Sequence, residues 1–332
     1  MFCRLFSTGV SFGPAIQATL MPSNKPKLQI VPRKPAAASS PPQTSPPEAV
    51  SARWLAAAVA TVLAAAGLCA WGVLCLLFWQ GSWQLLYHPT ASVARTPAAA
   101  GLSYSAVAFA VDGSGAARLN GWWIPAPQGA SLGRYSVLYF HGQDGNLGDT
   151  VDQLAQFHSA GVNVFAFDYR GYGQSVFAHP GEKGWLEDAG WALDYLAETR
   201  HVDPRTIVLA GSALGANLAL QFAAAHPQLA GVALVSPLNE PVEAVFRDAR
   251  ASLVPGRLLV RDRFDLNAPA TELRIPSLWL LPASNDNQPR VAAKAEAFQK
   301  VPGRKTLVWL TPSSGANDAL AHSFSSWLKS LS

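Results

Sequence analysis

Short apolar runs alternate with helix-periodic segments over the last two thirds of the chain. The compact apolar runs suit strands that are buried on both faces of a sheet, and they lie at Ser136–Phe140, Asn163–Phe167, Thr206–Ala210, Gly231–Val235, Ser277–Leu281 and Lys305–Leu310. The helix-periodic segments are Asp149–Ser159, Trp185–Thr199, Leu214–His226, Arg290–Val301 and Asp318–Leu331. This alternation predicts an α/β domain with a mostly parallel sheet and helices on both faces.

Two further segments depart from this alternation. Ala106–Asp112 and Arg118–Trp123 predict an antiparallel hairpin before the first buried strand. Residues 239–273 have weaker patterning, which favours a small lid there. We expect one domain over residues 81–332, with its function at the carboxyl ends of the parallel strands.

The region before the domain contains one long uncharged stretch. No Asp, Glu, Lys or Arg occurs from Trp54 to Ala94, and Trp54–Phe78 is long enough to cross the roughly 30 Å hydrocarbon layer as a helix. A buried core helix and a cleaved signal peptide are the alternatives. The signal peptide is disfavoured because 53 residues precede the span and its apolar stretch is too long. We predict a transmembrane helix over residues 54–80, with Trp79, Trp83 and Tyr87 in an interfacial aromatic belt.

Charge before the span predicts its orientation. The segment from residue 22 to the span contains one acid, Glu48, and five basic residues, Lys25, Lys27, Arg33, Lys34 and Arg53. The positive-inside bias therefore places the N-terminus in the cytoplasm and the domain on the non-cytoplasmic side. Residues 1–53 are rich in Pro, Ser and Ala and predict a disordered basic tail, with Met21 as an alternative start.

The charge and cysteine content of the chain limit which ligands and partners it is expected to bind. The formal net charge is +4, but much of the basic excess lies in the tail, where attraction to a lipid bilayer explains it better than nucleic acid does. The three cysteines are Cys3, Cys69 and Cys75, so the domain has neither a disulfide framework nor a thiolate metal site. No cluster has metal-ligand spacing and no phosphate-binding loop occurs, so neither a metal nor another cofactor is implied.

Three strand ends carry glycine-rich turns. The first reads HGQDGN over residues 141–146, where backbone N–H groups can face a developing oxyanion. The second reads DYRGYGQS over residues 168–175. The third, GSALGA over residues 211–216, is a tight strand-to-helix turn with small residues around Ala213, as a nucleophile elbow requires.

These three motifs, with LLYHP at Leu85–Pro89 behind an N-terminal span, resemble the membrane-anchored branch of the α/β-hydrolase (ABHD-type) family. The resemblance covers residues 83–330. It implies the α/β-hydrolase fold and a serine hydrolase that acts on acyl esters, thioesters or lipids. It also implies a Ser-His-Asp triad, in which serine supplies the covalent chemistry and histidine moves its proton.

Carried onto this chain, the resemblance gives an incomplete triad. The nucleophile position of G-x-S-x-G falls on Ala213, and the base position of the G-H-N-D turn falls on Ala316. The acid falls on Asp286, in a loop that departs from the family pattern by one residue and lacks its glycine. The oxyanion hole is assigned to the N–H groups of Gln143 and Leu214. The residues expected to shape the site are His141, Gly142, Gly211, Gly215 and Tyr169.

Three readings of this site remain open. In the first, the chain is a serine hydrolase disabled by alanine at both positions. In the second, it is a natural pseudohydrolase that binds a lipid, another small acyl ligand or a protein without chemistry. In the third, the neighbouring Ser212 or the oxyanion hole supports residual activity.

The expected substrate of the active form of this hydrolase is inferred only from the position of the site relative to the membrane. The segment between span and domain is short, so the pocket stays near the bilayer. This favours membrane-derived acyl esters, lysolipids or acylated proteins over distant soluble substrates.

Overall fold

The computed structural model describes residues 49–331 apart from 112, 283–295 and 311–315. Contacts within the chain divide it into two units, residues 1–57 and 58–332, and each is considered by itself. The described part of the first unit is exposed and enters a helix at Ala52. The elements that form the candidate site all belong to the second unit.

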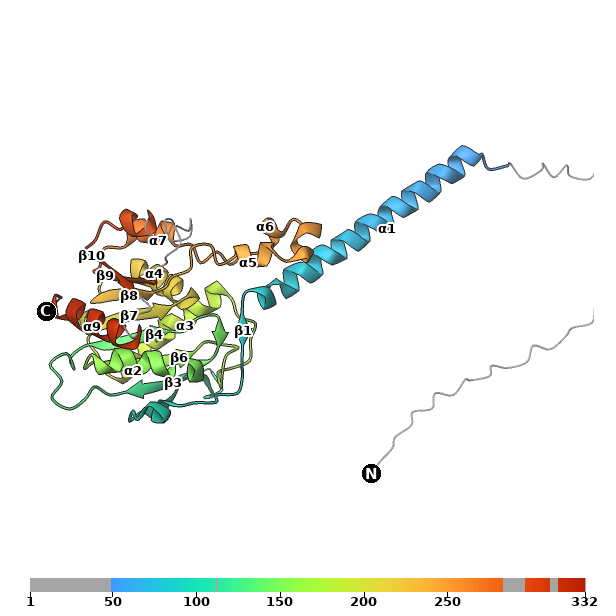
Figure 1. Cartoon of the computed structure of the whole chain (residues 1–332). Coiled ribbons are helices and arrows are strands. Elements are labelled where there is room, and N and C mark those ends of the chain that lie inside the picture. Colours follow the sequence, from blue (N-terminus) through green and yellow to red (C-terminus); the bar gives the residue numbers. More distant parts are fainter. Residues whose placement is uncertain (1–48, 112, 283–295, 311–315, 332) are drawn as a thin grey trace, which may run out of the picture. The chain divides into compact units, whose positions relative to one another are not determined.

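Helix α1 occupies the predicted apolar span. It runs from Ala52 to Gly81 and is followed by the short 3-10 helix η1, Ser82–Leu85 (Figure 1). The helix is long and apolar enough to cross a membrane, and only 6% of its most apolar 18-residue window is buried. Such exposure does not fit the alternative of a core helix, which would be mostly buried.

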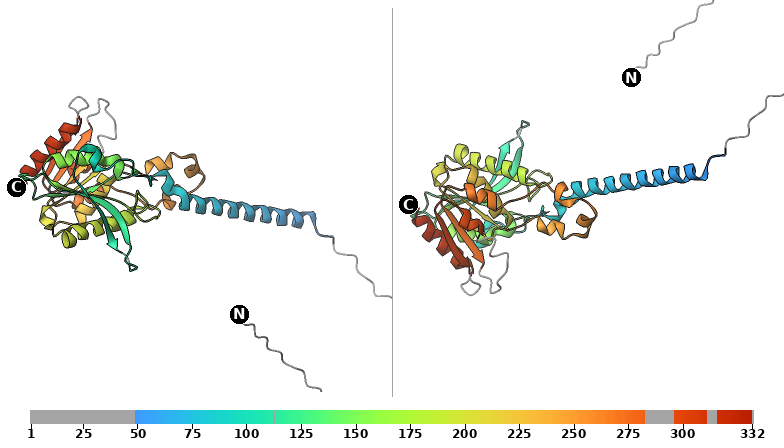
Figure 2. Two further views of the ribbon diagram at one scale, coloured as in Figure 1. Left: turned by 90° about the horizontal axis from the view of Figure 1, so that it is seen from below. Right: turned by 90° about the horizontal axis from the view of Figure 1, so that it is seen from above.

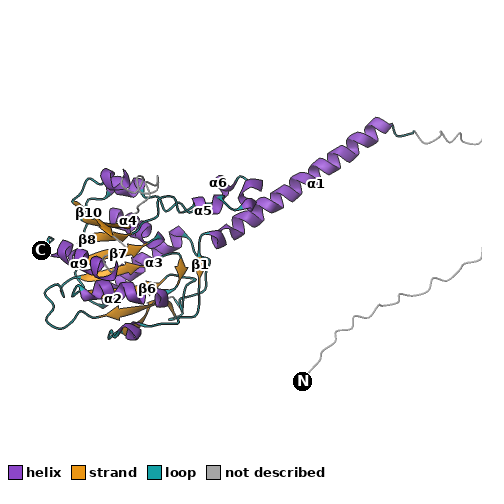
Figure 3. Cartoon of the chain, in the orientation of Figure 1, coloured by secondary structure: helices purple, strands orange, loops and turns teal. Residues whose placement is uncertain are grey.

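Within the described residues, the main sheet has eight strands in the order β10-β9-β8-β7-β4-β6-β3-β2. All neighbours from β10 to β6 are parallel, whereas β3 is antiparallel to both β6 and β2 (Figure 3). The bounds are β2 Ser105–Val111, β3 Ala117–Ile124, β4 Ser136–Phe140, β6 Asn163–Asp168, β7 Ile207–Ser212, β8 Gly231–Val235, β9 Ser277–Pro282 and β10 Lys305–Leu310. The predicted mostly parallel sheet with an antiparallel hairpin at one edge is confirmed.

Helices cover both faces of the sheet. On one face lie α2 and α9, and on the other lie α3, α4 and α7 (Figure 2). Their bounds are α2 Val151–Ser159, α3 Glu182–Asp194, α4 Leu214–Ala225, α7 Asn267–Glu272 and α9 Ala316–Lys329. A π-helical turn, Tyr195–Thr199, continues α3, and residues 296–300 are helical within the predicted segment Arg290–Val301. The strands β9, β8, β7, β4 and β6 are almost entirely buried between these layers because both of their faces are apolar. The expectation of burial on both faces is wrong for Lys305–Leu310, because β10 is the edge strand and is only partly covered.

Short elements connect the layers at the carboxyl edge of the sheet. β1 (His88–Pro89) and β5 (Asp144–Gly145) form a separate parallel pair. The 3-10 helix η3, Leu147–Thr150, leads from β5 into α2, and Asn146 caps it together with Asp149. Two further 3-10 helices are η2, Pro97–Ala100, and η5, Pro204–Thr206.

The lid, defined here as residues 239–263, leaves the domain between β8 and α7. It contains α5 (Glu243–Phe246), η6 (Ala249–Leu253) and α6 (Gly256–Leu259). Its two ends are held by the fully buried Asn217 of α4. The Asn217 amide donates to the carbonyls of Leu238 and Phe264 at 2.7 and 2.8 Å, and its oxygen accepts from the Leu238 N–H at 2.8 Å. The helix that starts at the candidate elbow therefore also fixes the base of the lid.

Candidate active site

The turn between β7 and α4 has the backbone of a nucleophile elbow. Ala213 lies there with φ 50° and ψ −121°, a conformation that L-residues rarely adopt. Its N–H donates to the Val235 carbonyl at 3.1 Å, which fastens the turn to the end of β8. The side chain at position 213 is thereby held on a sharp turn at the carboxyl edge of the sheet, where such a turn exposes a nucleophile.

Close backbone contacts explain the two glycines around Ala213. A Cβ on Gly211 would lie 2.3 Å from the Gly215 carbonyl oxygen, and a Cβ on Gly215 would lie 2.2 Å from that of His141. Both distances are far shorter than any real carbon–oxygen contact, so the turn tolerates only glycine at these positions. The spacing G-x-A-x-G is thus a geometric requirement of the turn rather than a composition bias.

The predicted oxyanion turn faces the elbow. A Cβ on Gly142 would lie 3.5 Å from the Cβ of Ala213, so the two turns are in van der Waals proximity. No hydrogen bond within the described part of the chain uses the N–H of Gln143 or of Leu214. Two backbone donors therefore remain for an oxygen bound between the turns, which is the composition of an oxyanion hole.

The segment that leaves α1 is attached directly to this turn. The His88 N–H donates to the Gln143 carbonyl at 3.0 Å, and the Thr90 N–H donates to the Gly145 carbonyl at the same distance. The His88 imidazole also lies 2.7 Å from an Asp144 carboxylate oxygen on the surface. The LLYHP motif thus supplies a strand that orders the oxyanion turn, a role that its residue pattern does not indicate.

The two tyrosines of DYRGYGQS hold the same turn from the other side. The Tyr169 hydroxyl donates to the His141 carbonyl at 3.2 Å, and the Tyr172 hydroxyl donates to the Gln143 carbonyl at 2.8 Å. Tyr169 also stacks on the buried Trp185 with ring centroids 4.0 Å apart. These hydrogen bonds fix the carbonyl groups of the turn. Its backbone N–H groups are thereby also held in place, as a preorganised oxyanion hole requires.

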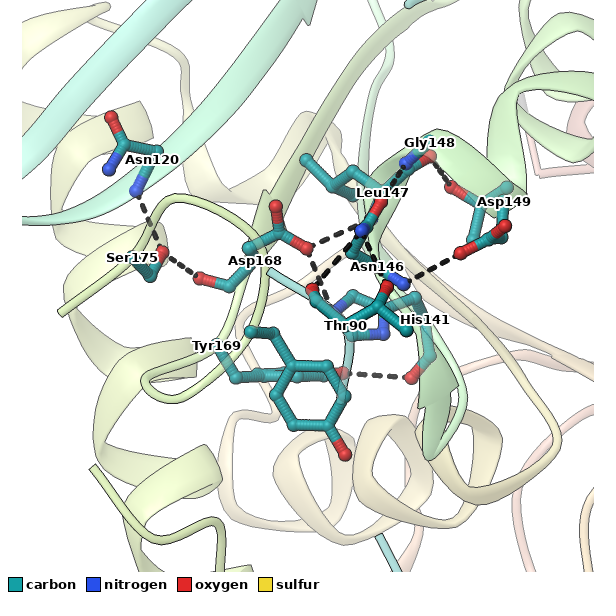
Figure 4. A network of polar contacts seen from close by, with 12 residues as sticks. Thr90, Asn120, His141, Asn146, Leu147, Gly148, Asp149, Asp168, Tyr169 and Ser175 are labelled. Atoms are coloured by element: carbon teal, nitrogen blue, oxygen red, sulfur yellow. Dashed lines mark hydrogen bonds and ion pairs between the residues drawn. The ribbon is translucent and has the colours of Figure 1, made fainter. Parts of the chain in front are cut away.

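Asp168 links the motifs of the first two strand ends (Figure 4). One carboxylate oxygen accepts from the Leu147 N–H at 2.9 Å, and the Asp168 carbonyl accepts from the Ser175 hydroxyl at 2.6 Å. Asn146 continues the network by donating to the hydroxyl of Thr90 at 2.7 Å. The sequence contained a hint of this network in the pair Asn146 and Asp149, which has the spacing of a capping box.

Burial favours the neutral forms of the His141 and Asp168 side chains. The His141 Nδ1 lies 2.8 Å from the Gly142 carbonyl and must carry the hydrogen, because a carbonyl only accepts. Its Nε2 lies 3.6 Å from an Asp168 oxygen, beyond hydrogen-bond length. Burial lowers the pKa of His141 to about 4 and raises the pKa of Asp168 to about 7. His141 is therefore packed within the turn with a neutral imidazole, and its role in shaping the site stays a prediction.

Arg170 has a structural partner. Its guanidinium donates to the buried Asp188 at 2.6 and 2.8 Å and contacts Glu187 at 3.0 Å. The Arg170 N–H donates to the same Asp188 carboxylate at 2.8 Å. This arrangement ties the second turn to α3 and supports the interpretation that DYRGYGQS shapes the site.

Two residues near the lost triad positions, Ser212 and His322, do not replace them. The Ser212 hydroxyl lies 2.9 Å from the buried Tyr139 hydroxyl, on the α2 side of the sheet. His322 is exposed on α9, well past the helix start at Ala316. The position of Ser212 fits a packing role, because its oxygen is engaged away from the elbow.

Two predicted triad positions cannot be placed as side chains. Asp286 lies outside the described residues. Ala316 is the first residue of α9, directly after a segment that is also outside them. The assignment of these positions stays a prediction from the resemblance. Among the residues that the structure does describe, no group of three His, Cys, Asp or Glu side chains converges to hold a metal ion.

The strained turn gives a direct stability test. Replacing Ala213 by glycine should stabilise the protein by about 1 kcal/mol, because strain of ~1–3 kcal/mol is removed and the entropy loss of glycine offsets part of it. The matched control, Ala216→Gly inside α4, should destabilise by about 1 kcal/mol. Thermal unfolding of the detergent-solubilised chain measures both. If Ala213→Gly lowers the free energy of unfolding as much as Ala216→Gly does, the backbone at Ala213 is not strained.

Comparison with known proteins agrees with this geometry. A family described as serine aminopeptidase, S33, matches residues 133–261, which include the elbow, both neighbouring turns and most of the lid. An uncharacterised protein of Mycobacterium tuberculosis, Rv2307c, is 30% identical over 250 residues, covering 73% of this chain and 86% of that protein. Protein bem46 of Schizosaccharomyces pombe is 38% identical over 92 residues, covering 27% and 30%.

Solved structures show the same fold at low sequence identity. The esterase Pf2001 of Pyrococcus furiosus superposes with a TM-score of 0.58 at 16% identity, over 74% of this chain and 97% of that one. An α/β hydrolase of Vibrio vulnificus superposes with a TM-score of 0.52 at 21% identity, over 64% and 77%.

Proposed function

Because this chain belongs to the α/β-hydrolase family, we propose that it is a membrane-anchored hydrolase of the serine type whose chemistry is disabled, as the chain stands, by alanine at positions 213 and 316. The proposed parent reaction is hydrolysis of an acyl ester, thioester or lipid. In that reaction a serine at the elbow attacks the carbonyl carbon, and a histidine accepts the serine proton.

The strained elbow is the observation that supports this proposal best. Ala213 has a φ of 50°, a strained conformation from which an alanine side chain gains nothing chemically. Gly211 and Gly215 permit the close backbone contacts of the sharp turn on which a nucleophile is presented. The facing turn, residues 141–146, is held on one side by the His88 N–H and on the other by the Tyr169 and Tyr172 hydroxyls. An elbow and an ordered facing turn around Ala213 support a hydrolase that has lost its nucleophile.

The membrane part of the proposal comes from α1 and its connection. The helix is long and apolar enough to span a bilayer, and its most apolar window is almost entirely exposed. Only six residues, 82–87, separate its end at Gly81 from β1, which pairs with the oxyanion turn. We propose that the positive-inside bias of the tail keeps the N-terminus in the cytoplasm, with the domain across the membrane.

Labelling with a fluorophosphonate tests the hydrolase type. The chain as it stands should not react, whereas the Ala213→Ser, Ala316→His double variant should be modified at residue 213, as mapped by mass spectrometry. Labelling of Ser212 in the unchanged chain would contradict the elbow assignment. If neither chain reacts or turns over any acyl ester, the result would favour a pseudohydrolase that binds a lipid or protein.

The substrate class needs its own measurement. We expect the same double variant, reconstituted in vesicles, to hydrolyse lysolipids and long-chain acyl esters in preference to short soluble esters, because its site lies close to the bilayer. Ratios of kcat/KM across a series of acyl chain lengths measure this preference. A clear preference for short soluble esters would contradict the membrane-derived substrate while leaving the hydrolase assignment intact.

A further inference from the structure

Large apolar side chains are exposed next to the end of α1. In the lid, Leu253 is 62% exposed and Leu258 is 83% exposed. A second exposed pair, Val176 and Phe177, lies in the loop whose His179 stacks on Trp83 of η1 with ring centroids 4.9 Å apart. Outside α1, the other exposed large apolar side chains in the described residues are Val111 and Trp309, together with Val50 before the helix. Most of this exposure within the domain is therefore gathered beside the span.

The lid packs along the span itself. The Trp71 indole N–H donates to the Leu253 carbonyl at 3.1 Å. α5 and α6 lie beside the C-terminal part of α1 in two orientations (Figures 1 and 2). Farther along, the Arg261 guanidinium lies over the Trp79 ring, 5.0 Å from its centroid. The lid thus follows α1 over more than two helical turns.

The position of Trp71 sets a depth for the lid. If the middle of Trp54–Phe78, at Ala66, lies at the bilayer centre, a half-thickness of about 15 Å places the hydrocarbon boundary about ten residues on, near Leu76. Trp71 then lies about 8 Å inside the hydrocarbon, and the Leu253 carbonyl lies beside it. A backbone carbonyl at that depth needs a protein donor, and the Trp71 indole supplies one.

The space between lid and helix is also apolar. A cavity of about 250 Å³ is lined by Leu74, Leu77, Phe78, Gly81, Ser82, Gln84, Leu85, Arg250, Leu253 and Val254. The lid contains five arginines and four acids, which gives a net charge of +1. Two of the arginines form ion pairs within the lid, Arg250 with Asp248 and Arg257 with Glu243. Arginines beside exposed leucines form the pattern of an element that lies in the headgroup boundary of a membrane.

We infer that the lid is a second membrane-binding element, which dips into the same leaflet as the C-terminal end of α1 and places Leu253 and Leu258 among lipid acyl chains. The partner is the bilayer leaflet, with anionic headgroups favoured by the lid arginines. This inference rests on the proposed crossing of the membrane by α1. Asn217 of α4 ties the base of this element to the helix that begins at the elbow.

A fluorescent label on the lid tests the inference in the full chain. Cys3, Cys69 and Cys75 are first replaced by alanine, and Leu258→Cys is then labelled with bimane after reconstitution in phosphatidylcholine vesicles with phosphatidylglycerol. The matched control is Val111→Cys, which is 64% exposed on the β2–β3 hairpin, apart from the lid (Figure 2). Because residue 258 is so exposed, the substitution should leave folding intact.

Doxyl-labelled lipid should quench the label at residue 258 roughly threefold more than the label at residue 111, and aqueous iodide should show the reverse order. Equal quenching of both labels by iodide would overturn the inference. Shielding at 258 from iodide without quenching by doxyl lipid would also overturn it, in favour of a protein partner. Vesicle flotation after carbonate washing separates the two proposals. If the chain floats with the vesicles but iodide still quenches the label at residue 258, only the lid inference is refuted. If the chain does not float, the membrane anchoring by α1 is refuted.

Discussion

Replacing Ala213 by serine and Ala316 by histidine together should raise the hydrolysis of p-nitrophenyl esters by at least about 10⁴-fold in kcat. Loss of either group in a serine protease costs roughly a million-fold, and residual rate enhancement comes from the oxyanion hole and binding. This chain retains a turn with two available N–H donors, at Gln143 and Leu214, so the missing part is the nucleophile with its base.

The single variants decide whether the two positions act as one unit. Ala213→Ser alone and Ala316→His alone should each recover only a small part of the rate, because an unactivated serine is a weak nucleophile and a histidine without it has no partner. Steady-state rates of all four chains in detergent give the coupling directly. Rates that add independently would contradict the assignment of position 316.

Ser212 provides the control within the restored chain. Adding Ser212→Ala to the double variant should leave turnover within about twofold, since the Ser212 hydroxyl is engaged with Tyr139 and faces away from the elbow. Loss of most of the activity would show that Ser212 participates, and would favour the third reading of the site.

The sequence predicts the sheet well because its strands are buried on both faces. The runs at Ser136–Phe140 and Gly231–Val235, which are buried along their whole length, match strands β4 and β8 residue for residue. A strand covered by helices on both sides has no polar positions, so its ends coincide with the ends of the apolar run. Half-buried segments such as β2 carry a weaker pattern, and there the predicted and observed ends differ by one or two residues.

The contacts that order the site were not predictable in the same way. Pairing of β1 with β5 involves two residues of each strand, and such short pairings carry no periodicity. Asn217 is one of two polar residues in the otherwise apolar helix α4, and only its position beneath the lid reveals that it holds both lid ends. The contact of Trp71 with Leu253 joins residues 182 positions apart, which local patterns cannot report.

The second large expected effect concerns the buried acid beneath the oxyanion turn. Asp168→Asn should stabilise the protein at pH 8 and leave its stability unchanged at pH 4. Asparagine can accept the Leu147 N–H as the aspartate does, and it has no charge to desolvate. Because burial raises the pKa of Asp168 to about 7, the folded state holds a proton that the unfolded state releases near pH 4.

The direction of the effect follows from linkage. A raised acid pKa contributes stability that is fully present below about pH 4 and is lost as the pH rises to about 7, on the order of 4 kcal/mol in all. The neutral, buried His141, with its pKa lowered to about 4, acts oppositely and adds on the order of 3 kcal/mol as the pH rises from 4 to 6.5. In the unchanged chain the two contributions nearly cancel over that window.

Asp168→Asn should therefore expose the His141 dependence that the unchanged chain conceals. We expect the midpoint of thermal unfolding of the variant to rise by about 10 °C between pH 4 and pH 7 relative to that of the unchanged chain. The exposed Asp194→Asn is the matched control and should not change the shape of the profile. A parallel profile for Asp168→Asn would show that the pKa of Asp168 is the same in the folded and unfolded states, which would contradict the effect of its burial.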